Sequence, residues 1–475
     1  MVNSLYRNMP KFAFRPAAYL AAVIGIVVVL HEALGHQIDL VWVAAGLLCL
    51  PVLGIALMRF PAAFAVLPLF VPRLREFSNS SRFDSILLGL TPLGAAAGLL
   101  GLALLIRLLA ICSRRGSVYD LFRGAKAGIR AYLLFAAVLA ASYIYTSAPQ
   151  YGGDKLIEFL TTGVLLFFAP FVLFLQDSDF RDFTITALVL ALVFGAQQLF
   201  RSQQQISLVA GENTVHIGVG QLIGVALILI LSRSTFLRSR ERPLVWLSAV
   251  WLVAGLISAE ARGPLISLIV ALGTSLIIRR WQPMNVSAKV GLAKVGLAIG
   301  VLGVTIVLLA TYWFRGPAMS KFRAKSTEVF QLAEGTSNLK GTAGQRLYYY
   351  GYAMDAIADK PLLGWGIGGW STFYWHQDDK HYPHNLLMEV GVEQGIAGLV
   401  VLAFLLVTVF LTVKRTIINT GRGGVFLIVL SYCLSLTMFS GDLDDNRFLW
   451  FWCGAALAAC RMYQQTLQED YQAQQ

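Results

Sequence analysis

Long apolar runs, separated by short polar links, recur along the sequence and restrict its fold more than any other feature. A helix needs roughly 20 mostly apolar residues to cross a lipid bilayer. The candidate spans are residues 16–31, 40–58, 62–72, 86–106, 131–148, 156–176, 183–200, 214–232, 244–259, 264–280, 295–313, 392–413, 424–440 and 448–461. One of these runs, 62–72, is too short and too interrupted by proline to count as a full span.

Charged residues make up only 13% of the 475-residue chain, about half the share that is usual in a soluble protein. The sequence therefore predicts an all-α polytopic integral membrane protein with about 12, or as many as 14, transmembrane helices. The net charge of +12 does not indicate nucleic acid as a partner, because the basic residues lie in short loops between apolar runs. Membrane lipids are the expected surroundings.

The positions of the basic residues predict which loops face the cytoplasm. Lysine and arginine cluster at 107–130, 233–242, 279–294 and 414–422, and such clusters mark cytoplasmic loops. The acidic stretch at 176–182 goes against this rule. Both chain termini are then cytoplasmic, and the one long hydrophilic segment lies on the outer side.

Four parts of the chain follow from this orientation. Residues 1–313 are the transmembrane bundle, 314–391 are the outer loop or cap, 392–463 hold the last transmembrane helices, and 464–475 are a cytoplasmic tail. The tail is polar, and we expect it to be disordered.

The outer loop has structure of its own. Residues 344–359 have a helix-like pattern that Pro361 must end, because proline cannot continue a helix. The sequence GWGIGGW at 364–370 then joins flexible backbone to aromatic rings that suit a membrane–water interface. Two interpretations remain open, namely a packed amphipathic cap on the bundle and a lid over a lipid-linked substrate.

The stretch HYPHNLLMEVGVEQG at 381–395 carries the strongest candidate catalytic group. Pro383 fits the first turn of a helix that continues into 392–413, which predicts His384 at a helix N-terminus. On a helical period His384, Gly391 and Gly395 share a face, and the glycines allow close packing. The helix dipole favours a neutral imidazole, which can act as a general base. The alternative is an interfacial histidine that is bonded to a backbone carbonyl.

Three arginines are expected on the same outer side. Arg201 follows a predicted span, Arg262 lies in the turn EARGPL, and Arg346 lies in the outer loop. Paired guanidinium groups can hold a phosphate or pyrophosphate in a bidentate manner. The alternative for each is a structural ion pair, and for Arg262 the neighbouring partner is Glu260.

Several other kinds of site have little or no support in the sequence. There is no Gly-x-x-x-x-Gly-Lys-Ser/Thr loop, and no His/Cys cluster has zinc spacing. The five cysteines lie in or beside apolar runs and read as small core side chains. The acidic sequence GDLDDNRF at 441–448 suits either a divalent ion or a solvated connecting turn, and we favour the turn. We therefore expect no metal.

Three motifs resemble the O-antigen ligase and polymerase superfamily of bacterial inner-membrane glycosyltransferases. The first is an arginine followed by a helix and PLLGWGIGG. The second is PHNLLMEVGVEQGIAG, with a ligase-type spacing from His384 to Gly395. The third is EARGPL, which is similar to a Ser-Arg turn of the family but has alanine at position 261. The layout of many spans with one large outer loop agrees over most of the chain.

The resemblance implies a reaction and its partners. Such ligases transfer a glycan from undecaprenyl pyrophosphate to lipid A–core oligosaccharide at the periplasmic face of the inner membrane, with inversion and without metal or cofactor. By this likeness His384 is the base, and Arg201 and Arg262 bind the pyrophosphate, with Arg346 as a third candidate. His381 and Asn385 are further candidates for substrate contact.

Rival activities remain. An O-antigen polymerase uses a second lipid-linked glycan as acceptor, and the His384–Gly395 spacing favours the ligase over it. A protein O-oligosaccharyltransferase usually has a larger domain after its last spans, where this sequence has a short tail. A transporter or flippase of lipid-linked glycan is a different class, and it would have broken helices near mid-membrane rather than polar features at one face.

Overall fold

The computed structural model describes residues 53–69, 92–113, 117–203, 213–231, 242–258, 262–278, 280–281, 342–439 and 441–474. All regular secondary structure in these ranges is helical, which confirms the all-α expectation. The predicted spans 16–31 and 295–313 lie outside the described residues, as does most of 40–58.

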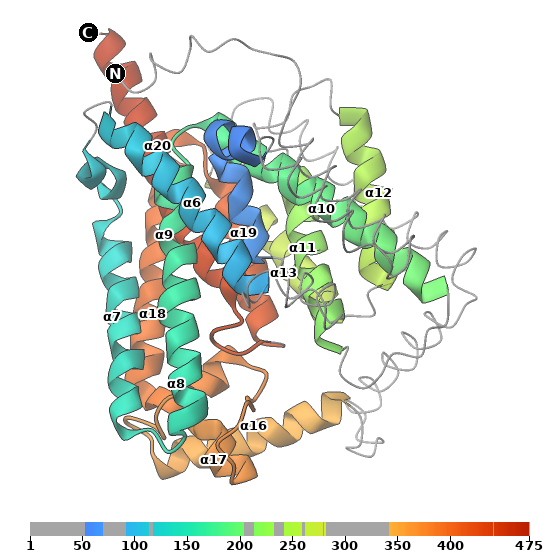
Figure 1. Cartoon of the computed structure of the whole chain (residues 1–475), viewed down its shortest axis with the longest axis vertical. Coiled ribbons are helices and arrows are strands. Elements are labelled where there is room, and N and C mark those ends of the chain that lie inside the picture. The colour runs from blue at the N-terminus through green and yellow to red at the C-terminus, as the bar shows by residue number, and fades with distance from the viewer. Residues whose placement is uncertain are drawn as a thin grey trace.

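The described helices form one bundle with a cap at one end (Figure 1). The bundle consists of η1 (Pro61–Val66), α6 (Pro92–Ser113), η2 (Val118–Phe122), α7 (Lys126–Ser142), η3 (Tyr143–Tyr145), α8 (Pro149–Glu158), η4 (Phe159–Gly163), α9 (Val164–Leu173), α10 (Asp177–Gln203), α11 (Asn213–Leu231), α12 (Arg242–Ser258), α13 (Arg262–Ile278), α18 (Leu386–Thr420), α19 (Gly424–Thr437) and α20 (Arg447–Gln474). The cap consists of α16 (Thr342–Asp359) and α17 (Gly369–Trp375).

Four of the described helical segments are long and apolar enough to cross a membrane. They are Gly94–Ser113, Lys126–Tyr145, Pro149–Leu173 and Leu386–Thr420. Shorter apolar helices are Gly218–Leu231, Arg262–Ile278 and Gly424–Thr437. The structure thus agrees with a helical membrane protein, whereas the total of 12 or 14 spans stays a prediction.

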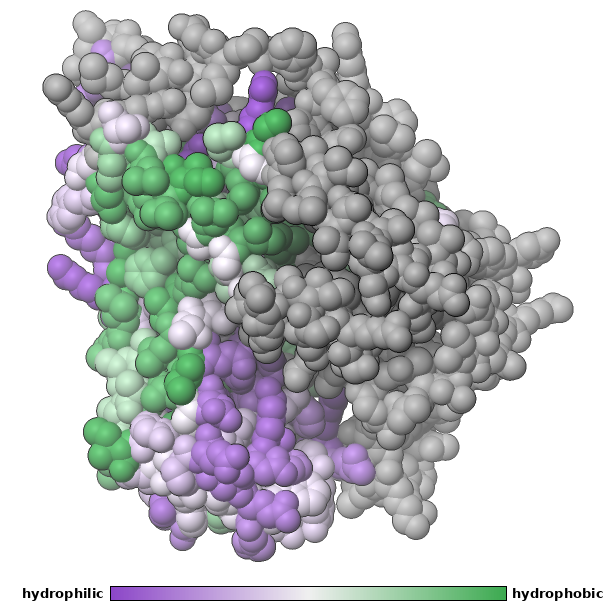
Figure 2. Space-filling view, in the orientation of Figure 1, coloured by the Kyte–Doolittle hydropathy of each residue, from purple (hydrophilic) through white to green (hydrophobic). Residues whose placement is uncertain are grey.

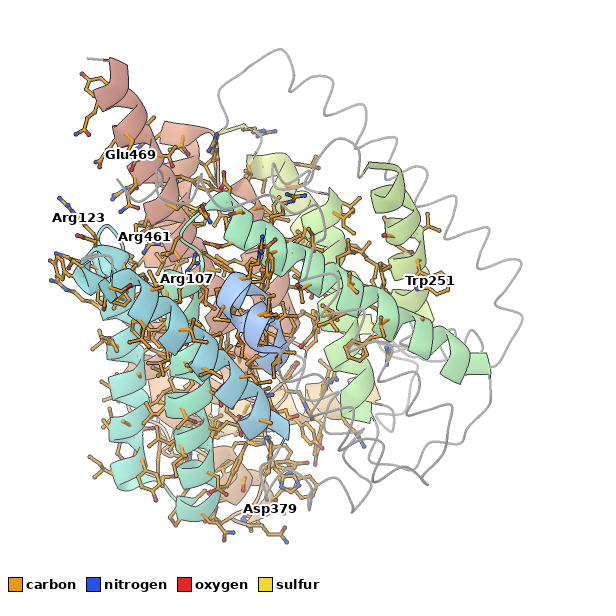
Figure 3. All side chains as sticks on the ribbon, turned by 45° about the horizontal axis from the view of Figure 1, so that its top comes forward. Arg107, Arg123, Trp251, Asp379, Arg461 and Glu469 are labelled. Carbon is orange, nitrogen blue, oxygen red and sulfur yellow. The ribbon has the colours of Figure 1, made fainter. Side chains whose placement is uncertain are left out.

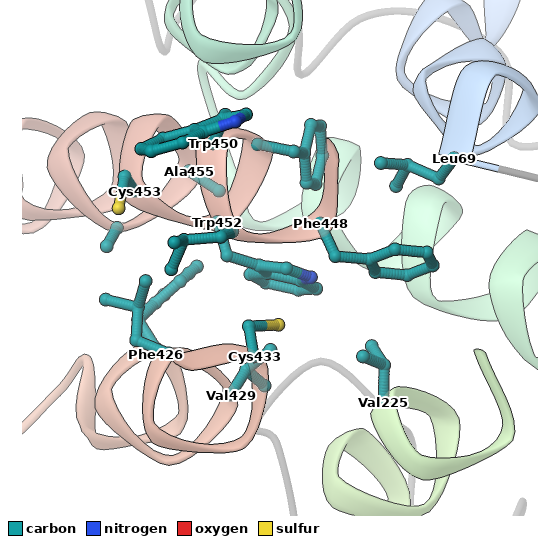
Figure 4. Close-up of a cluster of buried hydrophobic side chains, with 14 of the residues drawn as sticks. Leu69, Val225, Phe426, Val429, Cys433, Phe448, Trp450, Trp452, Cys453 and Ala455 are labelled. Carbon is teal, nitrogen blue, oxygen red and sulfur yellow. The ribbon is translucent and has the colours of Figure 1, made fainter. Parts of the chain in front are cut away.

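Aromatic and small side chains fill the centre of the bundle. Trp450 and Trp452 on α20 are buried, and Cys433 and Cys453 pack beside them as the small core residues that the sequence predicts (Figure 4). A methyl group on Gly454 would meet the backbone carbonyl of Phe167, so α20 and α9 lie in direct backbone contact.

The two ends of the bundle differ in chemistry. At one end the guanidinium of Arg461 donates to the carbonyls of Leu121, Phe171 and Phe174, at 2.6, 3.2 and 3.1 Å. At the other end the hydroxyl of Tyr145 donates to the carbonyl of Leu363, which ties the cap to the bundle. Figure 3 shows Arg461 and Asp379 at these opposite ends, and Figure 2 shows the cap end as hydrophilic beside an apolar flank.

Helix α18 departs from the expected pattern. It begins at Leu386 with Asn385 as its N-cap, so Pro383 is not in its first turn, and that prediction was wrong. Its backbone also breaks at Gly395, where φ is 64° and ψ is −159°, so His384 and the following glycines share no continuous helical face. The amides of Ile396 and Ala397 instead donate to the carbonyls of Pro361 and Leu362, at 2.8 and 3.2 Å.

Two other expectations concern the cap and the tail. The predicted helix over 344–359 is confirmed by α16, which ends at Asp359 before Pro361. The predicted disorder of 464–475 is wrong, because α20 continues as a helix to Gln474.

Candidate functional site

His384 lies in the loop between α17 and α18, at the cap end of the bundle. Its backbone is in the left-handed region, with φ of 58°, and its side chain is half-buried. The imidazole lies 4.5 Å from the ring of Tyr382 and 6.3 Å from that of Tyr349, measured between centroids. The imidazole therefore contacts an edge-on ring of Tyr382 and a stacked ring of Tyr349.

The amides of the α18 N-terminus are already satisfied by the chain itself. The side-chain oxygen of Asn385 accepts from the amides of Leu387 and Met388, at 3.0 and 3.2 Å. Its side-chain nitrogen donates to the carbonyl of Met438 at 3.4 Å. These two amides are therefore not available to an anion beside His384. Substrate contact by Asn385 stays a prediction.

The neutral state that we expected for His384 has a different physical cause. Burial and the nearby Arg346 guanidinium lower the pKa of His384 to about 4, against the weaker opposing effect of Asp442. The helix dipole is not needed for this result. At neutral pH the imidazole is uncharged, so one of its ring nitrogens is free to accept a proton.

Helix α16 brings Arg346 to this position. The hydroxyl of Tyr350, one turn further along α16, donates to the carbonyl of Met438 at 3.1 Å. Met438 follows the end of α19 and also receives the bond from Asn385. Met438 thus fixes both α16 and the start of α18, which puts Arg346 within electrostatic range of His384.

Arg262 begins helix α13 at the same end. A methyl group on the adjacent Gly263 would lie 3.3 Å from the Cβ of Phe439, the residue after Met438. Helix α13 packs along α19, where the hydroxyls of Ser267 and Ser435 are 3.0 Å apart. The structure therefore brings Arg262 and Arg346 to the same corner of the bundle.

The other predicted site residues are less constrained. Arg201 lies on the last turn of α10, but its side chain is outside the described residues, as is Glu260. The ring of His381 lies 4.8 Å from that of Trp375, and its Nδ1 is 3.6 Å from a carboxylate oxygen of Asp379. His381 thus lies on the outer side of the cap, next to an exposed tryptophan.

A buried ion cluster that we did not predict lies beside the histidine loop. The ammonium of Lys155 on α8 pairs with Glu389 and with Glu393 of α18, the latter at 2.7 Å, and with Asp442 at 2.9 Å. All four side chains are fully buried. Tyr151 donates its hydroxyl to Asp442. Because unpaired buried charges are costly, this cluster must hold α8, α18 and the 441–446 turn in fixed relative positions.

The acidic turn at 441–446 is not the solvated connection that we favoured. Asp442 is fully buried, and Asp444 is 3% exposed. Burial alone would raise the pKa of Asp442, but Lys155, a hydrogen bond with Glu389 and Lys380 hold that pKa well below its usual range. Burial and the neighbouring Asp442 and Asp445 charges raise the pKa of Asp444 instead.

One group of carboxylates has the spacing of a metal site. Oxygen atoms of Glu158, Asp444 and Asp445 lie within 4.8 Å of one another. Two basic side chains already occupy this group. Arg447 pairs with Glu158 and, at 3.4 Å, with Asp445, while the Lys380 ammonium is 3.3 Å from Asp445. The negative charge of these carboxylates is therefore offset by basic side chains of the chain itself.

Comparison with known proteins finds a family match that covers this corner of the bundle. A family model described as O-antigen ligase matches residues 247–403. The resemblance to the O-antigen ligase superfamily is thereby confirmed. The matched region contains α13, α16, α17 and the first half of α18, and hence Arg262, Arg346, His381, His384 and Asn385.

Two relatives agree with this family match. A Rickettsia conorii protein, provisionally named a polysaccharide ligase, is 26% identical over 106 residues, which are 20% of this chain and 26% of that protein. The exopolysaccharide production protein ExoQ of Rhizobium meliloti is 25% identical over 148 residues, which are 27% of this chain and 34% of that protein. The chain thus matches about a quarter to a third of the length of these relatives.

The region that the family model matches contains only half of the buried ion cluster. Glu389 and Glu393 lie inside it, whereas Lys155 and Asp442 lie outside. One sequence signal could have revealed the cluster. Two carboxylates four residues apart face the same side of a helix, and such a pair at the start of an apolar run needs a buried counter-ion.

Proposed function

We propose that this chain is an inverting glycosyltransferase of the O-antigen ligase type. In this proposal it transfers O-antigen polysaccharide from undecaprenyl pyrophosphate to lipid A–core oligosaccharide, at the periplasmic face of the bacterial inner membrane. The observation that carries the proposal is the neutral, half-buried His384 within electrostatic range of Arg346, at the end of the bundle where α13 begins with Arg262.

The chemistry assigns one role to each kind of side chain. His384 takes the proton of an acceptor hydroxyl, and the oxygen forms a bond to the anomeric carbon as the bond to the pyrophosphate oxygen breaks. The pyrophosphate leaves with the electron pair of that bond. Arg262, Arg346 and Arg201 stabilise its charge through bidentate hydrogen bonds, which act most strongly where water is excluded.

Donor binding would also strengthen the base. In this structure Arg346 is one of the two causes that keep the pKa of His384 at about 4, which makes the imidazole a weak acceptor. A pyrophosphate on the Arg346 guanidinium offsets that positive charge and adds negative charge nearby. The pKa of His384 then rises toward neutrality only when the donor is present, which suits a base that must not act on water alone.

A deletion strain tests the proposal directly. If the chain is a ligase, its loss leaves lipid A–core uncapped while lipid-linked polymer accumulates. Complementation with His384→Ala should not restore capping, although the protein reaches wild-type abundance in the membrane. Arg262→Lys should also fail, because lysine cannot form the bidentate fork. Capping that persists in either complemented strain would refute the role of that residue.

The polymerase is the second candidate, and the similarity to an exopolysaccharide production protein favours keeping it. A polymerase deletion would instead leave one repeat unit attached to the core. A protein O-oligosaccharyltransferase would leave core capping intact and remove glycan from a protein acceptor. Purified protein that joins glycan from one lipid to another in detergent, without ATP or an ion gradient, would exclude a flippase.

A further inference from the structure

The cap carries a continuous series of aromatic rings that starts at His384 and ends at the molecular surface. Tyr349 on α16 lies against His384, and its ring centroid is 5.3 Å from that of Tyr374 on α17. Tyr374 is in turn 5.0 Å from Tyr352 and 5.1 Å from Trp375. Such spacings are those of ring pairs in direct contact, so the series has no gap.

The outer members of this series are open to solvent although they are large and aromatic. Tyr348 is 47% exposed, Tyr352 is 38% exposed and Trp375 is 41% exposed. The hydroxyls of Tyr348 and Tyr352 are 3.0 Å apart, so their rings stand side by side on the surface of α16. Exposed aromatic clusters beside a reactive group indicate a binding surface, because covering such rings with a ligand lowers the free energy.

The surroundings of the rings favour a sugar over a lipid. Trp375 is followed by the polar stretch HQDDKH, and the end of the bundle where this stretch lies is hydrophilic, in contrast to the apolar flank of α6 to α9 (Figure 2). A pyranose ring has an apolar C–H face that packs on an aromatic ring and hydroxyls that reach polar atoms. Tyrosine and tryptophan combine an aromatic face with a polar tip and so match both features. A lipid chain would need no such polar neighbours.

We propose that Tyr348, Tyr352, Tyr374 and Trp375 form a glycan-binding platform. It holds sugar residues beyond the one that reacts at His384. This inference rests on the proposed glycan transfer and names a second subsite for it. The ring of His381, packed on Trp375, completes the outer edge of the platform. The occupant is a neutral or weakly charged oligosaccharide, whether it belongs to the donor polymer or to the acceptor core.

Kinetics with glycans of different length test the platform. Tyr352→Ala and Trp375→Ala should each raise KM by about ten-fold for a long glycan, the loss expected for one well-packed aromatic contact. KM for a glycan of one or two sugars and kcat should stay unchanged, because the reacting atoms are not touched. Tyr352→Phe, which keeps the ring, should retain most of the affinity. Tyr471→Ala, an exposed tyrosine at the opposite end of the bundle, is the matched control.

Two series separate the sources of the glycan. In one series the donor polymer varies in length with a fixed acceptor, and in the other the core acceptor varies with a fixed donor. If KM no longer depends on glycan length in the variants for one series, the glycan varied in that series is the one that binds the platform. An equal loss for short and long glycans in both series, or no loss for either, would overturn the proposal.

A binding measurement separates the platform from the catalytic role of His384. Saturation-transfer NMR with a free oligosaccharide that lacks lipid and pyrophosphate should show contact in the full-length His384→Ala protein. That contact should be lost when Trp375→Ala or Tyr352→Ala is added. Binding that survives both additions refutes the platform, whatever His384 does. If His384→Ala restores capping, His384 is not the base, but the NMR evidence for the platform is unaffected.

A lipid-facing role would give a different signal. In proteoliposomes, brominated phospholipid would quench the fluorescence of Trp375, and the quenching would fall in Trp375→Phe. We expect the fractional quenching in Trp375→Phe to be no lower than in the wild type. A clear fall in the variant would overturn the proposal in favour of a membrane contact.

Discussion

The Nζ atom of Lys155 lies 2.7 Å from an Oε1 atom of Glu393, and neither side chain is exposed to solvent. The same ammonium also pairs with Glu389 on the first turn of α18 and with Asp442 before α20. Since α18 begins two residues after His384, this cluster sets the position of the helix from which the histidine loop starts. The ion cluster is thus a structural support of the candidate site.

Replacement of Lys155 by methionine should therefore destabilise the protein strongly. Removing one partner of a buried ion pair leaves carboxylates without compensation, at a cost of about 3–5 kcal/mol. Thermal unfolding in detergent measures the loss. Lys380→Met is the control, because the Lys380 side chain is 50% exposed and its ion pairs are screened. A Lys155→Met protein that unfolds at the wild-type temperature would contradict the structural role.

Gly395 should tolerate no side chain. Its φ of 64° favours glycine, and a methyl group would lie 2.5 Å from the backbone carbonyl of Leu362. We expect Gly395→Ala to cost at least about 1–3 kcal/mol, the usual cost of a strained backbone position. Gly351→Ala is the matched control, because a methyl group there meets nothing within 4 Å and should stabilise α16 by about 0.5–1 kcal/mol. Equal unfolding temperatures for the two variants would refute the explanation.

Local signals explain which parts of the cap were predictable. Helix α16 was predicted correctly because its periodic pattern and Pro361 lie in one short stretch of sequence. The start of α18 was misassigned because Pro383 and Asn385 both suit a helix beginning. Only the left-handed backbone at His384 separates the two alternatives, and no local pattern encodes it. The break at Gly395 depends on carbonyls of the 361–362 backbone, which a single helical pattern cannot reveal.

The buried ion cluster was missed for a related reason. Asp442 lies in an acidic turn that, taken alone, is typical of a solvated connection. Its main partner, Lys155, is 287 positions earlier in the chain, and the two meet only in the folded bundle. The sequence could indicate His384 and the arginines as candidates for one site. It could not indicate that Arg346, rather than the helix dipole, acts on His384.

Replacement of Arg346 by glutamine should raise the pKa of His384, because it removes one of the causes that lower it to about 4. In the proposed mechanism the base works in its neutral form, so activity should fall as pH drops below the histidine pKa. The acid limb of kcat/KM, which reports the free enzyme, should therefore move to higher pH in the variant. In the wild type the acid limb of kcat should lie at higher pH than the acid limb of kcat/KM. The reason is that bound pyrophosphate offsets the effect of the Arg346 charge on the pKa of His384.

The pH profile has a clear control and a clear contradiction. Arg415→Gln removes an exposed arginine near the far end of α18, and its acid limb should match the wild type. Titration of His384 by NMR in both variants gives the same comparison without turnover. An acid limb that does not move in Arg346→Gln would show that Arg346 does not act on the base.

Chelation tests the role of the carboxylates Glu158, Asp444 and Asp445. Arg447 and Lys380 already supply positive charge to this group, so we expect EDTA and added Mg²⁺ or Ca²⁺ to leave transfer unchanged. Removing one of these two basic side chains should let the carboxylates bind a metal ion. Lys380→Ala removes the ammonium that lies 3.3 Å from Asp445. The unfolding temperature of this variant should therefore rise with Ca²⁺ more than that of the wild type. Wild-type transfer that EDTA abolishes and Mg²⁺ restores would make the group a metal site of the enzyme.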